Sequence, residues 1–149
     1  MTEFNAWWVA DMQREPFDQR LIVADNDSAM RSILRSVLDH PRRALFLAAN
    51  GLEAVEFAQR TPADLVLLDM RMPQLDGLEA CARIREIPRY QDIPIVILTA
   101  FDGEVARRKA RRLGATAFLV KPFTTDALLR NLAPLIEVGS QVTRRHLAG

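Results

Sequence analysis

Short apolar runs alternate with helical patterns along most of this chain. Apolar runs at residues 21–24, 44–48, 65–68, 94–99 and 117–121 predict five buried strands. Amphipathic helical patterns follow these runs in turn, at residues 28–39, 52–59, 78–87, 104–113 and 126 to about 137. This alternation favours a parallel sheet, because parallel strands need crossover connections that place helices on both faces. We therefore predict an α/β fold with a doubly wound, five-stranded parallel sheet.

The chain is long enough for one domain with short extensions. We predict an N-terminal extension at residues 1–18, the folded domain at 19–138 and a short C-terminal tail at 139–149. In the extension, Trp7 and Trp8 belong to an apolar set with helical spacing, which predicts a short amphipathic helix. Two hypotheses stay open for these tryptophans: they pack on the parent domain, or they contact a partner or a second copy. Pro134 is expected to kink the last helix or to begin a final short turn.

Composition excludes several broad classes of protein. With 49% hydrophobic and 26% charged residues, the chain is an ordinary globular sequence, and its net charge of +1 gives no bulk attraction to nucleic acid or membranes. We find no apolar run of about 20 residues and no secretory signal pattern. A single cysteine, Cys81, lies in a helical pattern and is expected to be a small buried residue. We therefore expect a cytoplasmic protein that contacts neither membrane nor nucleic acid directly.

Polar residues follow four of the five predicted strands. Asp25, Asp69, Thr99 and Lys121 each stand where an apolar run ends. An isolated aspartate at such a position often only caps the following turn. The carboxyl ends of parallel strands lie along one edge of a sheet, however, so these four groups are expected to converge in one cleft. Two close carboxylates need a cation, which Lys121 supplies in part and which Mg²⁺, with its preference for oxygen ligands, could complete.

Four segments resemble a known family. Residues 21–27 (LIVADND), 67–77 (LLDMRMPQLDG), 94–100 (PIVILTA) and 114–123 (GATAFLVKPF) are similar, in order and spacing, to the motifs of two-component response regulator receiver domains. The resemblance covers about residues 20–137. It implies a flavodoxin-like sheet of strand order 2-1-3-4-5 and a stand-alone, chemotaxis-receiver-like signalling protein.

The resemblance also implies a phosphorylation site. Asp69 would take a phosphoryl group from a phosphohistidine on a histidine kinase or a phosphotransfer protein, as in a phosphorelay. Asp25, Asn26 and Asp69, with the backbone carbonyl of Arg71, would hold Mg²⁺ or Mn²⁺. The chain would then be no enzyme in the wider sense, because it would catalyse only its own Mg²⁺-dependent phosphorylation and dephosphorylation.

Further matches imply a conformational switch. The Thr99 hydroxyl and the Ala100 N–H would bind phosphoryl oxygens, and Lys121 would pair with Asp69 and then with the phosphate. Phe118 stands where the family has a rotating aromatic residue that reports the state to the surface. The Lys121–Pro122 bond matches a cis peptide of the family, a geometry that is cheap only before proline.

Asn26 departs from the family pattern, which usually has a second acid there. An amide oxygen can ligate a metal but brings no charge, so Mg²⁺ affinity is expected to fall by about 1 kcal/mol or more. Asp27 either compensates for this loss or caps the helix that starts near residue 28. A first alternative function is therefore a pseudo-receiver, a protein-binding module with a weakened metal site. A second alternative takes residues 25–27 as the DxD nucleophile pair of a haloacid-dehalogenase-like phosphatase.

The helix at 104–113 has an unusually basic side. Arg107, Arg108, Arg111 and Arg112 lie opposite a face formed by small and apolar residues. This side is either simply solvated or a docking surface for an acidic effector or an identical subunit. In receiver domains, this helix, the strand at 117–121 and the last helix form the output face, so a homodimer stays open as well.

Overall fold

The computed structural model describes residues 19–100 and 103–148, so the hypotheses for Trp7 and Trp8 fall outside the described residues. Its five strands are all parallel and lie in the order β2-β1-β3-β4-β5. This order confirms the predicted flavodoxin-like sheet. The elements in chain order are β1 (Gln19–Ala24), α2 (Ser28–Leu38), β2 (Arg43–Ala48), α3 (Gly51–Arg60), β3 (Leu65–Asp69), α4 (Gly77–Arg85), η1 (Pro88–Tyr90), β4 (Ile95–Thr99), α5 (Glu104–Arg112), β5 (Ala117–Val120) and α6 (Thr125–Ala148).

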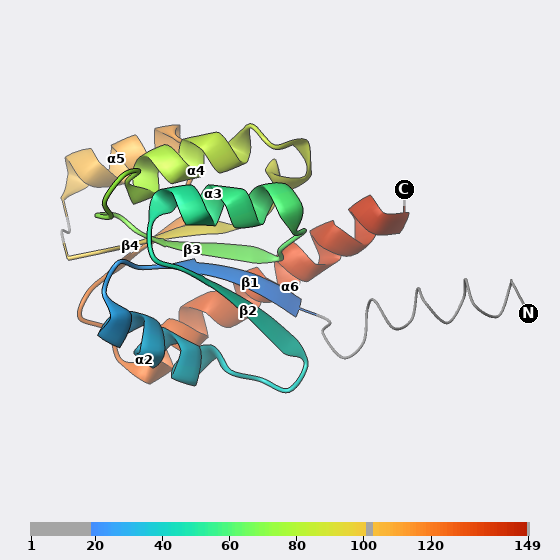
Figure 1. Cartoon of the computed structure of the whole chain (residues 1–149), viewed down its shortest axis with the longest axis horizontal. Helices are drawn as coiled ribbons and strands as arrows, with labels where there is room; N and C mark the ends of the chain where they lie inside the picture. The colour runs from blue at the N-terminus through green and yellow to red at the C-terminus, as the bar shows by residue number, and fades with distance from the viewer. Residues whose placement is uncertain (1–18, 101–102, 149) are drawn as a thin grey trace, which may run out of the picture.

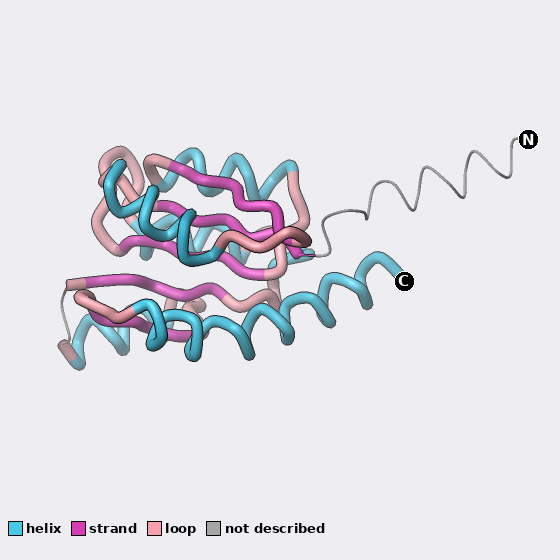
Figure 2. The backbone as a smooth tube through the Cα atoms, turned by 90° about the horizontal axis from the view of Figure 1, so that it is seen from below, coloured by secondary structure: helices cyan, strands magenta, loops and turns pink. Residues whose placement is uncertain are grey.

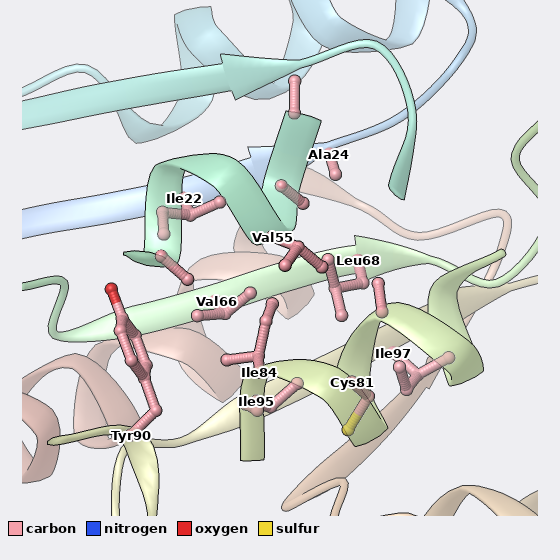
Figure 3. Packing of buried hydrophobic residues seen from close by; sticks show 14 of the residues in the cluster. Ile22, Ala24, Val55, Val66, Leu68, Cys81, Ile84, Tyr90, Ile95 and Ile97 are labelled. Atoms are coloured by element: carbon pink, nitrogen blue, oxygen red, sulfur yellow. The ribbon is translucent and has the colours of Figure 1, made fainter. Parts of the chain in front are cut away.

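Helices cover both faces of the sheet. Figure 1 shows α3, α4 and α5 on one face and α2 and α6 on the other. Alternate residues of the central strands point to opposite faces, so Val66 and Leu68 join one hydrophobic core while Leu65 and Leu67 join the other. Figure 3 shows the first core, where Ile22, Ile95 and other strand residues meet side chains of α3 and α4. This two-sided burial explains why the strands are continuous apolar runs in the sequence.

Polar residues begin three of the helices. The side chains of Asp27, Asn50 and Asp76 accept hydrogen bonds from backbone N–H groups in the first turns of α2, α3 and α4. Asn50 and Asp76 thus stand at helix starts, although Asn-Gly and Asp-Gly pairs are also common in turns. At the other end of α5, Gly114 has a φ of 106°, a left-handed conformation that is typical of a glycine after the end of a helix.

The last helix is longer than predicted. We expected it to end near Glu137, but α6 continues past Pro134 to Ala148. Its first half contributes Leu128, Leu132 and Ile136 to the core under α2, whereas Val142 reaches the opposite core. Figure 2 shows this helix running along the sheet and beyond it. The close approach of Gly139 to the entrance of β3 makes the extension possible, because a Cβ atom there would lie 1.6 Å from the Asp64 carbonyl oxygen.

Three smaller findings concern the helices. No helix within residues 19–100 and 103–148 has both the length and the apolar character needed to cross a membrane. In α2, Ile33 is half exposed, and Leu34 and Leu38 are the residues that are fully buried. Cys81 is buried in α4, as expected for a small apolar residue.

Candidate functional site

The polar residues at the strand ends converge, as the strand pattern predicted. Asp25 follows β1, Asp69 ends β3, Thr99 ends β4 and Lys121 follows β5. Together they line a cleft of about 370 Å³ at the carboxyl edge of the sheet, which Asn26, Asp27, Met70, Arg71 and Ala100 complete. The cleft thus lies where open α/β sheets bind ligands.

Lys121 joins the two carboxylates at the bottom of this cleft. Its Nζ donates to Asp25 Oδ2 and to Asp69 Oδ1, each at 3.1 Å. Asp25 is fully buried and Asp69 is 8% exposed, so both charges are largely removed from water. Two carboxylates and one ammonium leave a formal charge of −1 in a poorly hydrated place. This excess favours binding of a further cation.

The ionisation of the site reflects this charge balance. Burial, and then the negative charge of Asp25, raise the pKa of Asp69 above its ordinary value, although Lys121 acts in the opposite direction. For Lys121, burial lowers the pKa, but its hydrogen bond to Asp69 and the two carboxylate charges outweigh burial, so its pKa is raised. Lys121 is therefore a permanent cation at neutral pH. Asp69 is a carboxylate whose negative charge is only partly balanced.

The β1–α2 loop fixes Asp25 and uses Asp27 as a cap. Asp25 Oδ1 accepts the Asp27 N–H at 2.9 Å, and the Arg31 guanidinium donates to the Asp25 carbonyl oxygen at 2.7 Å. The Asp27 carboxylate accepts from the N–H groups of Ala29 and Met30. The capping hypothesis for Asp27 is therefore confirmed. Because capping already accounts for Asp27, its position gives no support to the DxD phosphatase alternative.

The β3–α4 loop brings backbone close to Asp69. The Gly77 N–H donates to the Met70 carbonyl at 2.9 Å, and a Cβ atom on Gly77 would lie 2.1 Å from the Asp69 carbonyl oxygen. Within the loop, Gln74 has a φ of 69°, a left-handed conformation that is uncommon outside glycine. Sequence reasoning missed the role of Gly77 here, although a glycine following the acidic strand end was an available signal. It also missed Arg31, for which no local pattern exists.

The oxygen donors of the cleft suit a hard metal ion. Asp25, Asn26 and Asp69 bring two carboxylates and one amide to the cleft, which Arg71 also lines. Among the described residues, no group of three or more His, Cys, Asp or Glu side chains is arranged to hold a metal. A cation in this cleft would therefore need the amide and backbone oxygens as well as the carboxylates. Such a mixed oxygen set is typical of Mg²⁺ sites.

The predicted switch residues lie in two different places. The Thr99 hydroxyl is in the cleft and contacts the Met70 sulfur at 3.2 Å. Phe118 does not line the cleft; it belongs to β5, and the guanidinium of Arg107 on α5 covers its ring at 5.2 Å. The Lys121–Pro122 peptide bond is cis, as expected. Neither the Thr99–Met70 contact nor the Arg107–Phe118 contact could be found from sequence spacing, because each joins distant segments.

The basic side of α5 faces outward. Ala110 is buried and Ala106 and Leu113 are half-buried, whereas Arg108, Arg111 and Arg112 are exposed. Arg108 pairs with Glu104 at 3.3 Å on the surface of the same helix. The predicted division of this helix into a packed face and a basic face is therefore confirmed for these three arginines, whereas Arg107 is half-buried against Phe118.

Comparison with known proteins identifies what this arrangement resembles. A model of the response regulator receiver domain family matches residues 21–133. Response regulator MprA of Mycobacterium leprae is 38% identical over 117 residues, which are 78% of this chain and 50% of MprA. The chain spans about half or less of the length of the curated relatives it matches.

Solved structures of related proteins also align with most of this chain. The chemotaxis protein CheY4 of Vibrio cholerae aligns with a TM-score of 0.75 at 28% identity, covering 78% of this chain and 98% of CheY4. The receiver domain of the sensor histidine kinase PA1611 of Pseudomonas aeruginosa aligns with a TM-score of 0.73 at 29% identity, over 80% and 98% of the two chains. That receiver is described with a magnesium ion in its active site cleft.

Proposed function

Because this chain belongs to the response regulator receiver domain family, we propose that it is a phosphoacceptor switch that takes a phosphoryl group onto Asp69. The observation that carries the proposal is the position of Lys121, whose Nζ contacts both Asp25 and Asp69 in the cleft at the strand ends. The donor would be a phosphohistidine of a histidine kinase or phosphotransfer protein. Its phosphorus would form a bond to an Asp69 carboxylate oxygen while its P–N bond breaks, and the released imidazole nitrogen would take up a proton.

The neighbouring groups have distinct tasks in this reaction. The partial charge imbalance at Asp69 keeps its carboxylate nucleophilic, while Lys121 holds it in place and can pair with the incoming phosphoryl oxygens. Thr99 and Ala100 line the same cleft, so the Thr99 hydroxyl and the Ala100 N–H would bind the remaining phosphoryl oxygens. Asp25, Asn26, Asp69 and the Arg71 carbonyl would hold Mg²⁺ or Mn²⁺, which offsets negative charge on the phosphoryl group.

The conformational change would reach the surface formed by α5, β5 and α6. A shift of Thr99 toward the phosphoryl group would make room for Phe118. The two residues lie on the adjacent strands β4 and β5, in which Ile97 pairs with Phe118 and Thr99 pairs with Val120. Arg107, Arg108, Arg111 and Arg112 would then be part of the surface that a protein effector contacts. We propose no catalytic activity beyond the chain's own phosphorylation and dephosphorylation. A cytoplasmic location agrees with the single buried Cys81.

Incubation with phosphoramidate and Mg²⁺ tests this function. Phosphoramidate carries the same P–N bond as phosphohistidine, so it replaces the unidentified kinase. We expect intact-mass spectrometry to find one added phosphoryl group in the wild type and none in Asp69→Asn, and no adduct in the wild type when EDTA removes the metal before phosphoramidate is added. A wild-type protein that stays unmodified at saturating Mg²⁺ would refute the proposal and would favour the pseudo-receiver instead.

A further inference from the structure

A hollow lies at the amino edge of the sheet, at the other end of β3 from the Asp69 cleft. Its volume is about 230 Å³, and it is lined by Pro62, Ala63, Arg89, Thr143, His146 and Leu147. The first two residues precede β3, and the last three belong to the part of α6 beyond Pro134. The hollow is therefore separate from the proposed phosphorylation site, and the extension of α6 builds one side of it.

Arg89 brings a hydrogen-bond donor to this hollow. Its Nη2 donates to the carbonyl oxygens of Ala58 and Gln59 at the end of α3, at 2.5 Å and 2.8 Å. Its Nε is buried, and no acceptor within residues 19–100 and 103–148 forms a hydrogen bond with it. Leaving a buried donor of a charged group unpaired is costly, so Arg89 favours an acceptor from outside these residues. A carboxylate is the acceptor that a guanidinium binds most strongly.

Apolar side chains lie beside this donor. Pro62, Ala63 and Leu147 contribute to the lining, and Leu147 is 61% exposed. A leucine so exposed at the margin of a hollow offers contact area to a further apolar group. An indole suits such a place, because it combines a large apolar body with one polar N–H group.

The described chain begins next to the hollow. The Arg20 N–H donates to the Asp64 carboxylate at 2.8 Å, and the Asp64 N–H donates to the Arg20 carbonyl oxygen at 2.7 Å. Asp64 directly follows Ala63 of the lining, and Figure 1 shows the start of β1 and the end of α6 on the same side of the molecule. Residues 9–18 join Trp8 to β1, and ten residues span about 15 Å in a helix and up to about 35 Å when extended. The tryptophans are thus within reach of the hollow.

The N-terminal extension and the end of α6 have opposite charges. Residues 1–18 contain four acidic residues and one arginine, a side-chain charge of −3, so the rest of the chain has a net charge of +4. Arg144 and Arg145 directly follow Thr143 of the lining, and both are exposed. Electrostatic attraction therefore draws the extension toward this end of α6.

We propose that the N-terminal extension docks on this hollow, with one indole of the Trp7–Trp8 pair against Leu147 and with its carboxylates facing Arg89 and the arginines of α6. The docking is intramolecular. A short linker holds a segment at an effective concentration of about millimolar, which favours the extension of the same chain over that of a second copy. The docking does not depend on phosphorylation of Asp69, so either proposal can fail without the other.

Tryptophan fluorescence reports on the extension alone, because Trp7 and Trp8 are the only two tryptophans of the chain. We expect Leu147→Glu to raise the acrylamide quenching constant of the full chain about two- to threefold, since it removes the apolar contact and repels the acidic extension. Leu52→Glu is the matched control on α3, where the leucine is 40% exposed, and it should leave quenching unchanged. Circular dichroism checks that both variants are folded. Equal quenching in the wild type and in folded Leu147→Glu would refute the docking.

Charge reversal tests the electrostatic part. Arg144→Glu/Arg145→Glu should also raise the quenching constant, by about 1.5-fold or more. The matched control Arg35→Glu/Arg83→Glu changes the net charge equally at exposed positions of α2 and α4, and it should have no effect. Equal changes in the two double variants would show a response to net charge only and would refute the role of the α6 arginines.

A spin label locates the extension directly in an otherwise unchanged hollow. A nitroxide is attached to Asn5→Cys, while the buried Cys81 stays unlabelled. We expect the label to broaden the backbone amide NMR signals of Ala63 and Arg89 and to spare that of Asn26 in the Asp69 cleft. Broadening spread evenly over the domain, or none at Ala63 and Arg89, would overturn the proposal.

A mixed sample separates the two possible sources of the docked segment. Isotope-labelled protein without the nitroxide is mixed with spin-labelled protein that gives no NMR signal. We expect no broadening at Ala63 and Arg89 in this mixture, because each hollow is filled by its own chain. Broadening as strong as in the spin-labelled protein itself would assign the hollow to the extension of a second copy and would refute intramolecular docking.

Discussion

Asn26→Asp should strengthen Mg²⁺ binding and should also lower the thermal stability of the metal-free protein. The side chain is exposed at the rim of the cleft that holds Asp25 and Asp69, so a carboxylate there would face a bound ion directly. A unit negative charge about 4 Å from a divalent cation gains roughly 2 kcal/mol in a water-like dielectric. Partial loss of hydration reduces the net gain to about 1–2 kcal/mol, which corresponds to a dissociation constant roughly 5- to 30-fold lower.

Without metal, the same carboxylate only adds repulsion. A third negative charge beside Asp25 and Asp69 costs up to about 1 kcal/mol after the attraction of Lys121 is counted. The melting temperature of the metal-free variant should therefore fall by about 3–5 °C relative to the wild type. Mg²⁺ at 100 times its dissociation constant should raise stability by about 2.7 kcal/mol in either protein, so the variant needs less metal for the same gain.

Calorimetric titration with Mg²⁺ and thermal denaturation with and without EDTA measure both effects. Asp27→Asn is the matched control: asparagine also caps helices, and Asp27 is already engaged with α2, so Mg²⁺ affinity should hardly change. Equal Mg²⁺ affinity in Asn26→Asp and the wild type would refute the electrostatic reasoning. A loss of affinity in Asp27→Asn would instead show that Asp27 serves the metal as well as the helix.

Three further predictions concern the scaffold. Gly139→Ala should destabilise the fold by about 1–3 kcal/mol in urea denaturation, because its Cβ would overlap the Asp64 carbonyl oxygen; Val138→Ala, on the exposed side of α6, should cost far less, and equal losses would contradict the close-contact explanation. Burial raises the pKa of Asp64, which is 2% exposed, so the folded state holds its proton to higher pH than the unfolded chain and stability falls as pH rises from about 3.8 through the folded value. Asp64→Asn should therefore melt higher than the wild type at pH 7, with the gap closing toward pH 4; a gap that does not depend on pH would argue against this titration. Burial also raises the pKa of Cys81 to about 11, so a thiol reagent at pH 8 should modify it only after denaturation, and rapid labelling of the native protein would contradict its burial.

The features that could be predicted from the sequence are those that depend on patterns within a few neighbouring residues. The central strands β3 and β4 are buried on both faces, so each is a continuous apolar run, and the polar residues that follow four of the five runs mark the carboxyl edge of the sheet. Asp25, Asp69, Thr99 and Lys121 could be brought together on this basis alone, since parallel strands have only one carboxyl edge. The positions of the helices followed from their apolar spacing.

The features that could not be predicted depend on contacts between distant segments. The extension of α6 was missed because Pro134 and Gly139 both suggest a helix end, whereas packing against the entrance of β3 holds the helix together there. The role of Asn50 as the cap of α3 could not be predicted with certainty, because the same side chain caps both turns and helices. The cation–π contact of Arg107 with Phe118 joins two elements whose relative position only the folded chain determines.

The burial of the strands divides the cleft into a fixed side and a movable side. Every residue of β3, which ends in Asp69, is buried between two neighbouring strands, whereas all four residues of β5 at the sheet edge are only half-buried. Amide protons of β3 should therefore exchange with solvent only on global unfolding, while those of β5 should exchange through cheaper local openings. The reacting carboxylate is thus anchored to a fully buried strand, whereas Phe118 and the strand that leads to Lys121 lie where distortion costs less.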